Sequence, residues 1–191
     1  PLTEYIVLTD KQDEFMLYQA FAQWKYKFTN KLTLFTGIHY QQSNLNSDFA
    51  VEPRIALQWD LADKHSVTLG GGMHSMLQAH MIYFLQTELE DGTKIQTNKD
   101  VGFTKSDQAV LSYNYYPGEN FRIKIETYYQ NLRNVPVNEH YGWYSAVNEG
   151  AGFAISSLDS LINEGTGRNY GAELTIEKFF SKNYYFLITG S

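Results

Sequence analysis

Apolar and polar residues alternate with a period of two along the segment 13–41, on both sides of one short break. From 16 to 28 the even positions carry no charge and end in Trp24, Tyr26 and Phe28, whereas the odd positions turn polar toward the same end. After the break at 29–31 the chain resumes with uncharged even positions from Leu32 to Tyr40. Because successive side chains of a strand point to opposite faces, the segment predicts two long strands, a tight turn and one uncharged face.

The same arrangement of two strands around a short turn occurs three more times. Alternating segments lie at 51–59 and 66–74, at 106–115 and 121–130, and at 170–177, with turn residues at 60–64, 117–120 and 180–183. The segment 184–191 also reads as a strand, although both of its parities are apolar. Segments without alternation, at 42–49, 75–104 and 133–167, connect the pairs, and residues 1–12 fit either the tail of an earlier strand or a loop. We therefore expect an all-β fold, an antiparallel up-and-down meander of about eight long strands.

Charge separates the two faces of these strands. The positions assigned to one face contain no Asp, Glu, Lys or Arg, although charged residues make up 19% of the chain. A lipid-facing Arg or Lys at the midplane of a bilayer costs about 2–4 kcal/mol, which is a physical reason for such an exclusion. Strands of about ten residues suit a tilted membrane span. The pattern therefore predicts part of a transmembrane β-barrel, with one face toward lipid and the other toward the lumen.

Aromatic residues mark both ends of the uncharged face. One group lies beside the short turns, and a second group, which includes Tyr18, Tyr40, Tyr129 and Tyr170, lies toward the longer connections. Amphipathic rings prefer the two membrane interfaces, and outer-membrane barrels keep their short turns on the periplasmic side. We therefore expect a lipid-facing girdle on the periplasmic side at Trp24, Tyr26, Phe28, Trp59, Tyr113 and Tyr115.

Composition narrows the functional classes. A net charge of −6 over 191 residues argues against a nucleic-acid partner. The chain has no cysteine, so it has no disulfide framework, thiolate metal site or cysteine nucleophile. Because it starts at Pro1 and stops within the last alternating segment, we interpret it as a piece of a longer protein.

Candidate chemistry is sparse. The histidines lack metal-ligand spacing, and no nucleophile elbow appears, so we expect no catalytic residue, metal or cofactor. An enzyme with Ser, His and Asp on separate strands remains an alternative. The glycine-rich run 165–171 lacks the ending of a phosphate-binding loop and fits a flexible loop end. Inward residues near the long connections and one aromatic loop are the candidate ligand contacts: His39, His74, Arg54, Tyr141, Trp143 and Tyr144.

Each of these candidates also has a purely structural interpretation. The two histidines can simply be solvated or hydrogen-bonded, and inward charges such as Arg54 can form cross-strand pairs in a water-filled lumen or line a path for a substrate. The rings of 141–144 can bind a ligand or fold the loop onto itself. The sequence leaves these alternatives open.

The segments 50–59, 129–137 and 165–181 resemble wall segments of TonB-dependent outer-membrane receptors, and the likeness extends over about residues 13–191. The resemblance implies a barrel of about 22 strands in the bacterial outer membrane. It also implies an N-terminal plug domain inside the barrel and uptake, driven by the TonB complex, of an iron chelate, vitamin, glycan or peptide. The chain lacks the plug, the TonB box and a terminal strand that ends in an aromatic residue. We therefore expect residues 1–191 to be part of such a barrel domain.

Two other architectures fit the alternation. Eight strands can close a small outer-membrane barrel of the porin or adhesin kind. A soluble β-sandwich binding module also has one apolar face on each strand. The sandwich would fold as a monomer without detergent, whereas an open wall would expose unpaired edges.

Overall fold

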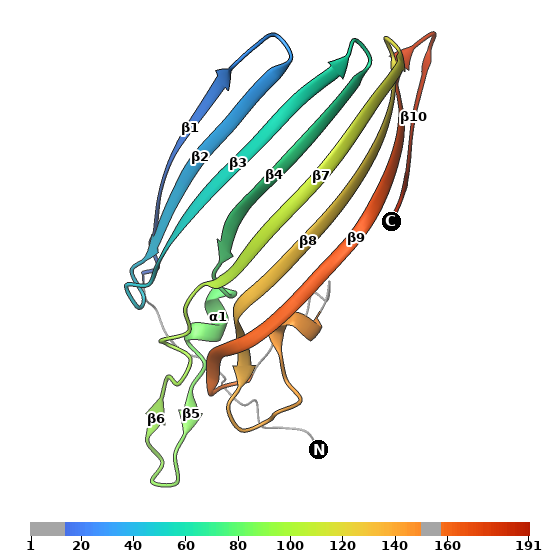
Figure 1. Cartoon of the computed structure of the whole chain (residues 1–191). Coiled ribbons are helices and arrows are strands. Elements are labelled where there is room, and N and C mark those ends of the chain that lie inside the picture. The colour runs from blue at the N-terminus through green and yellow to red at the C-terminus, as the bar shows by residue number, and fades with distance from the viewer. Residues whose placement is uncertain (1–13, 150–157) are drawn as a thin grey trace.

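One curved antiparallel sheet makes up most of the computed structural model, which describes residues 14–149 and 158–191 (Figure 1). Its eight strands pair in the order β1-β2-β3-β4-β7-β8-β9-β10, which confirms the predicted meander. The segment 1–12 lies outside the described residues. The strands are β1 (Leu17–Lys27), β2 (Leu32–Ser43), β3 (Phe49–Ala62), β4 (His65–Met76), β7 (Thr104–Gly118), β8 (Phe121–Asn138), β9 (Leu161–Ser181) and β10 (Tyr184–Gly190).

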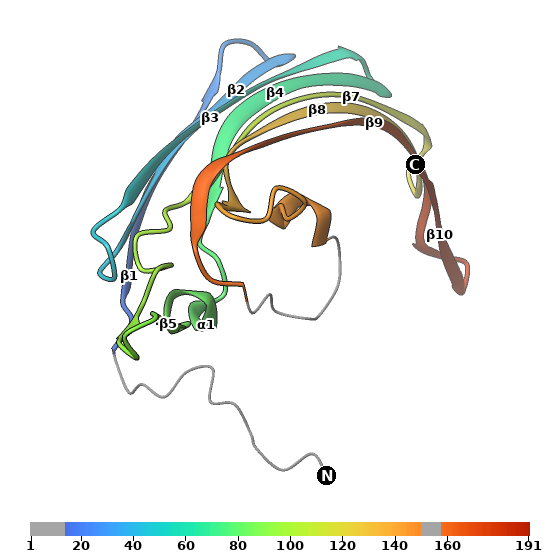
Figure 2. The same ribbon diagram turned by 90° about the horizontal axis from the view of Figure 1, so that it is seen from below.

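The sheet bends into an open arc with a convex and a concave face (Figure 2). The outer edges of β1 and β10 pair with no other strand in the described ranges, so the eight strands do not close a barrel by themselves. The only other sheet there is a two-stranded hairpin of β5 (Thr87–Glu88) and β6 (Lys94–Ile95), which excludes a sandwich of two large sheets. The architecture is therefore a curved wall.

Short turns gather at one end of the wall and the longer connections at the other (Figure 1). The hydroxyl of Thr29 accepts hydrogen bonds from the backbone N–H groups of Lys31 (3.1 Å) and Leu32 (3.0 Å), which closes the first turn. At the last turn Lys182 and Asn183 have φ of 50° and 67°. Two successive positive φ values match the twist of paired strands and give a two-residue hairpin.

Strands β8 and β9 extend farther toward the loops than the alternation predicts. Their connection spans 139–160 instead of 133–167, and the glycine-rich run 165–171 lies inside β9 rather than in a loop. In this extension polar and apolar residues follow no strict alternation, and the register shifts between Leu132 and Val135 and again between Val135 and Val137. Irregular pairing of the two strands interrupts the two-residue period in the sequence.

The long connections contain two short helices, which the sequence does not predict. These are α1 (His80–Tyr83), before β5, and the 3₁₀ helix η1 (Ala146–Glu149), before β9. Figure 2 shows both on the concave side of the arc. No helix in the described ranges is long and apolar enough to cross a membrane.

The convex face exposes apolar side chains that a soluble sheet would cover. Ile55, Leu69 and Trp59 are 58%, 59% and 55% exposed. On β9 the uncharged part of this face lies between Arg168 and Lys178, which are about ten residues or about 33 Å apart at 3.3 Å per residue. A strand tilt of 35–45° reduces this length to about 25 Å along the membrane normal, the height of the apolar band of outer-membrane barrels.

The register shows this tilt directly. A row of paired residues runs across the convex face from Trp24 on β1, near a short turn, to Tyr129 on β8 and Tyr170 on β9, nearer the loops. Six strand spacings of about 4.8 Å, at a tilt of 35–45°, correspond to about 17–20 Å along the membrane normal. The two aromatic belts therefore lie at different heights although the same row connects them.

Candidate functional site

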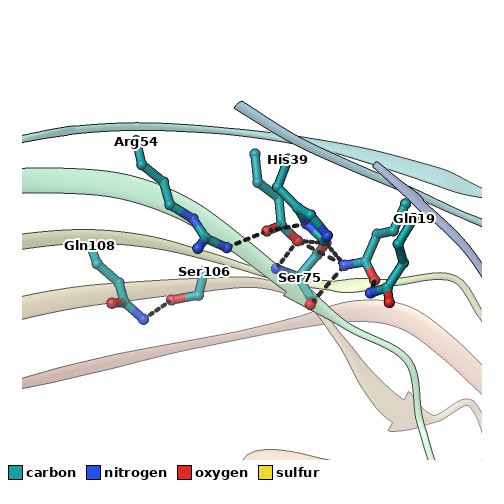
Figure 3. Close-up of polar contacts among 8 residues, drawn as sticks. Gln19, His39, Arg54, Ser75, Ser106 and Gln108 are labelled. Atoms are coloured by element: carbon teal, nitrogen blue, oxygen red, sulfur yellow. Dashed lines mark hydrogen bonds and ion pairs between the residues drawn. The ribbon is translucent and has the colours of Figure 1, made fainter. Parts of the chain in front are cut away.

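A buried carboxylate organises the polar side of the wall. Glu52 of β3 is only 3% exposed and lies within a polar network on the concave face. Figure 3 shows polar contacts of this face, with His39, Arg54 and Ser75 labelled. Its Oε1 accepts hydrogen bonds from Nε2 of Gln41 (2.7 Å), the backbone N–H of Ser75 (2.8 Å) and the Ser75 hydroxyl (2.5 Å). The network therefore joins β2, β3 and β4 at the end of the wall near the loops.

Pro53 interrupts the backbone hydrogen bonds between β3 and β4, so a side chain has to accept the hydrogen bond that the backbone no longer supplies. Pro53 has no N–H, and its carbonyl oxygen lies on the β4 side, 3.1 Å from the position that a Cβ on Gly72 would take. The β3–β4 register accordingly ends at Arg54–Gly72, whereas the β4–β7 register continues to Met76. The carboxylate of Glu52 accepts the hydrogen bond of the Ser75 N–H where the backbone ladder has stopped. A buried N–H without a partner would be costly.

Two of the predicted inward residues contact this carboxylate, and a third lies on the same face. Arg54 Nη2 lies 2.8 Å and His39 Nδ1 lies 3.0 Å from Oε2 of Glu52. The absence of a side chain at Gly72 leaves room for the Arg54 stem, whose Cγ would lie 3.0 Å from an added Cβ. His74 occupies the same face of β4, two residues beyond Gly72, and makes no side-chain hydrogen bond within the described residues.

A second polar row continues along the concave face over β7, β8 and β9. Ser106 Oγ accepts hydrogen bonds from Nε2 of Gln108 (3.1 Å) and Nε2 of Gln130 (2.8 Å). Asn169 Nδ2 donates to Oε1 of Gln130 at 2.8 Å. Nearer the short turns, Arg122 and Glu177 form an ion pair of 2.7 Å between β8 and β9. This part of the concave face is therefore a hydrogen-bonded polar surface, which suits water or a hydrated partner.

The apolar core of the molecule lies among the loops rather than in the wall. Buried residues from α1, the β4–β7 connection, the β8–β9 connection and the start of β9 pack together there. Burial raises the pKa of the Tyr83 hydroxyl to about 12, so this side chain stays neutral. The cluster comprises Ile82, Tyr83, Val101, Tyr144 and Leu161, with Leu45, Leu77 and Leu158 packed against it.

The side chain of Asn98 connects the loops to one another through hydrogen bonds. Its side chain is fully buried, and its Nδ2 donates to the carbonyl oxygens of Ile82 (3.1 Å) and Leu158 (3.0 Å). Its Oδ1 accepts from the N–H of Leu161 at 2.9 Å. One amide thus joins α1, the end of the β8–β9 connection and the start of β9. These bonds make the loops a fixed platform beside the concave face.

The loop platform gives a first prediction. Replacing Asn98 by alanine leaves the buried N–H of Leu161 without an acceptor, which should cost about 1–3 kcal/mol of local stability. We expect faster amide hydrogen exchange at Leu161 and in the β4–β7 connection, with exchange in β7 unchanged. Asn114→Ala, on the concave face near a short turn, is the control. Uniform protection in the Asn98→Ala variant would contradict the role of this side chain.

The aromatic loop residues divide into two groups. Tyr144 is buried in the loop core at 7% exposure, and its hydroxyl donates to Oε1 of Glu149 at 3.0 Å. Tyr141 and Trp143 are 51% and 72% exposed, with ring centroids 6.2 Å apart. Tyr144 therefore folds the loop, and the other two rings form an exposed aromatic pair.

The girdle residues lie on the convex side near the short turns. Trp24 and Tyr26 have ring centroids 6.0 Å apart, and Tyr26 meets Phe28 edge-on at 4.9 Å. Farther along, His65 of β4 stacks on Tyr115 at 4.6 Å, and its Nδ1 lies 2.7 Å from the Tyr113 hydroxyl. Trp59 is 55% exposed. The structure thus puts these rings on one side near the short turns, and their role as a girdle at the membrane interface stays a prediction.

The alternation places Glu52 among the inward charges, but it does not predict the contacts of Glu52 with Gln41 and Ser75. A glutamate next to a proline inside a strand is the sequence feature that could have identified Glu52, because a proline interrupts the backbone hydrogen bonds between strands. The partner Ser75 is recognisable only once the register is known. Within the described ranges no group of three or more His, Cys, Asp or Glu residues could hold a metal ion.

Comparison with known proteins agrees with this geometry. The family model described as "TonB dependent receptor-like, beta-barrel" matches residues 4–191. A search of the curated proteins gave no match. A mutant of the ferric enterobactin receptor PfeA from Pseudomonas aeruginosa superimposes with a TM-score of 0.62 and 13% identity, over 91% of this chain and 26% of that one.

Two further solved structures share the fold. The copper transporter OprC has a TM-score of 0.58 and 15% identity over 92% of this chain and 27% of its own. The outer-membrane transporter YddB from Escherichia coli has a TM-score of 0.59 and 13% identity over 86% and 22%. The chain thus spans about a quarter of the length of these structures. It belongs to the TonB-dependent receptor-like β-barrel family of the Gram-negative outer membrane, and it forms part of the wall of such a barrel.

Proposed function

We propose that this wall is part of a receptor that takes up a substrate actively across the outer membrane. The observation that carries the proposal is the contrast between the two faces of one open sheet. The convex face is uncharged over the height of a bilayer, and the concave face carries charged residues and hydrogen-bonded polar networks. A passive pore needs a polar lumen alone, whereas a receptor also needs ordered external loops, and Asn98 orders them here.

The proposed partners follow from the two faces. Outer-membrane lipid covers the convex face. An N-terminal plug domain of the parent chain lies against the concave network around Glu52, and the TonB complex acts through that plug. The substrate, a small molecule, glycan or peptide, meets the loop platform first. His39, His74 and Arg54 lie below that platform on the path into the lumen. No catalytic role and no nucleic-acid partner is part of the proposal.

Energised uptake separates this function from that of a passive pore. The experiment expresses the full-length protein in a Gram-negative host and measures cellular accumulation of ferric enterobactin and of Cu(II), the cargoes named for PfeA and OprC. We expect accumulation above the empty-vector level for a transported probe, and loss of this excess when a protonophore collapses the proton gradient. Accumulation that continues unchanged with the protonophore would show a passive pore and contradict the proposal.

The exposed aromatic pair gives a prediction for substrate capture. Replacing Tyr141 and Trp143 together by alanine removes two exposed rings, and we expect binding of the accumulated probe to weaken about tenfold or more, as for aromatic hot spots. The free energy of unfolding should change by less than about 0.5 kcal/mol, because exposed side chains contribute little. Phe180→Ala with Tyr185→Ala, two exposed rings at the short-turn end, should leave binding unchanged. Equal binding by both double variants would exclude the aromatic pair from the capture site.

A further inference from the structure

Three cations gather on the convex face where the uncharged band ends toward the loops. Lys105 of β7 pairs in register with Arg133 of β8, and Arg168 of β9 pairs with Asn131, two residues from Arg133 on the same face. Directly opposed side chains have Cβ atoms about 5 Å apart, and diagonal neighbours about 7–8 Å. The three positive groups are therefore adjacent on three consecutive strands.

The cluster lies just outside the aromatic belt on the loop side. Tyr129 and Tyr170 are register partners on β8 and β9, and Asn131 and Arg168 form the next pair on the same face, farther toward the loops. Aromatic rings mark the level of the headgroups in a bilayer. The cations are thus placed at the phosphate level of the external leaflet, and their side chains continue the surface that contacts lipid.

The internal pairing of the cluster leaves an excess of positive charge. Asp107 accepts hydrogen bonds from Nε (2.7 Å) and Nη2 (2.8 Å) of Arg133. This contact uses two of the five guanidinium N–H donors and fixes the plane of the group. Lys105 is half-buried and Arg168 is exposed, and neither makes a side-chain hydrogen bond or ion pair within the described residues. Three cations and one carboxylate therefore leave two positive charges unmatched.

A bound anion would relieve the electrostatic repulsion among these three cations. Like charges directly opposite each other in a sheet are destabilising, and Lys105 and Arg133 are such a pair. Asp107 offsets only one of them. A phosphate between the strands would accept hydrogen bonds from the free edge of Arg133 and from the lysine, because phosphate oxygens suit the guanidinium fork.

We propose that Lys105, Arg133 and Arg168 form a binding site for the phosphate of a lipid headgroup in the external leaflet. A free phosphate ion has the same headgroup chemistry, but the site opens onto the lipid-facing surface rather than the lumen. A lipid would supply acyl chains to the adjoining apolar band at the same time. The proposal rests on the placement of the wall in the membrane and does not depend on active uptake.

The test measures binding of bisphosphorylated lipid A to the purified full-length protein in detergent. Each cation near a membrane surface contributes about fivefold in affinity, which corresponds to about 1 kcal/mol. We expect the variant K105Q/R133Q/R168Q to bind at least tenfold more weakly. The control K25Q/K27Q/K31Q removes the same charge from the lumenal face and one short turn, and it should stay within twofold of the parent. Equal affinities of the parent and the first variant would overturn the site.

Two further measurements distinguish a lipid from a free anion and test whether weaker binding comes from misfolding. Dephosphorylated lipid A should bind at least tenfold more weakly than the bisphosphorylated form, and inorganic phosphate at 10 mM should leave lipid A affinity within twofold. Full displacement by inorganic phosphate would overturn the assignment to a lipid. The single variant R168Q removes an exposed side chain that has no partner among the described residues, so its fold should be intact and its affinity about fivefold lower. An unchanged affinity for R168Q would also contradict the proposal.

Discussion

Replacing Leu111 by arginine is expected to lower the free energy of unfolding in a lipid bilayer by about 2–4 kcal/mol. Leu111 lies on the convex face of β7, 49% exposed, midway between the charged end at Asp107 and the girdle residue Tyr115. An arginine side chain at this position either loses its hydration or distorts the bilayer so that its charge reaches water. The cost falls toward zero near the interfaces, which makes this central position the sensitive one.

The neighbouring residue supplies the control. Val110 shares strand β7 with Leu111 but points to the concave face, opposite Gly70 and Tyr128. Val110→Arg introduces the same charge on the lumenal side, where we expect a cost below about 1 kcal/mol. Urea titration of the full-length protein in vesicles, followed by tryptophan fluorescence, measures both variants. Equal losses at the two positions would mean that the faces do not differ in environment.

Replacing Glu52 by alanine is expected to cost about 3–5 kcal/mol, because it removes one partner of a buried charged network. The change leaves Arg54 without its carboxylate and the Ser75 N–H without an acceptor. Glu52→Gln keeps an oxygen for the Ser75 N–H and loses only the charge, so its cost should be about half as large. The matched control is Glu126→Ala, since Glu126 pairs with Lys124 on the same face but is partly exposed.

Hydrogen exchange gives this prediction a local readout. The amide of Ser75 depends on the Glu52 side chain, whereas the amides of β7 depend on backbone pairing. We expect exchange at Ser75 to accelerate at least tenfold in Glu52→Ala, to remain near the parent value in Glu52→Gln, and to be unaffected in Glu126→Ala. Full protection of Ser75 in the alanine variant would show that the carboxylate does not replace the missing ladder bond.

The alternation of side chains was sufficient to predict the wall. In a barrel strand the period of two is imposed by lipid on one side and water on the other, so residues such as Leu111 and Val110 reveal their faces from sequence alone. The same reasoning failed beyond the aromatic belt. There β8 and β9 continue without a strict alternation of polar and apolar residues, and nothing in the pattern distinguishes such a strand from a loop.

The site needed the register as well as the faces. His39 and Arg54 are predictable as inward residues, but their common partner Glu52 depends on where the β3–β4 ladder stops. The role of Asn98 is even harder to predict from the sequence, because Asn98 contacts Leu158 and Leu161, about sixty residues away along the chain. Contacts of this kind are set by loop folding, for which no short-range periodicity exists.

The central claim is that successive residues of one strand face lipid and lumen in turn. The most direct test places single cysteines along β7 of the full-length protein, in a background free of other cysteines, and labels each with an environment-sensitive fluorophore. The natural residues of this chain include no cysteine, so none has to be removed from it. Quenching by spin-labelled lipid should be strong for Ala109→Cys, Leu111→Cys and Tyr113→Cys and weak for Gln108→Cys, Val110→Cys and Ser112→Cys. Quenching without this alternation would contradict the account.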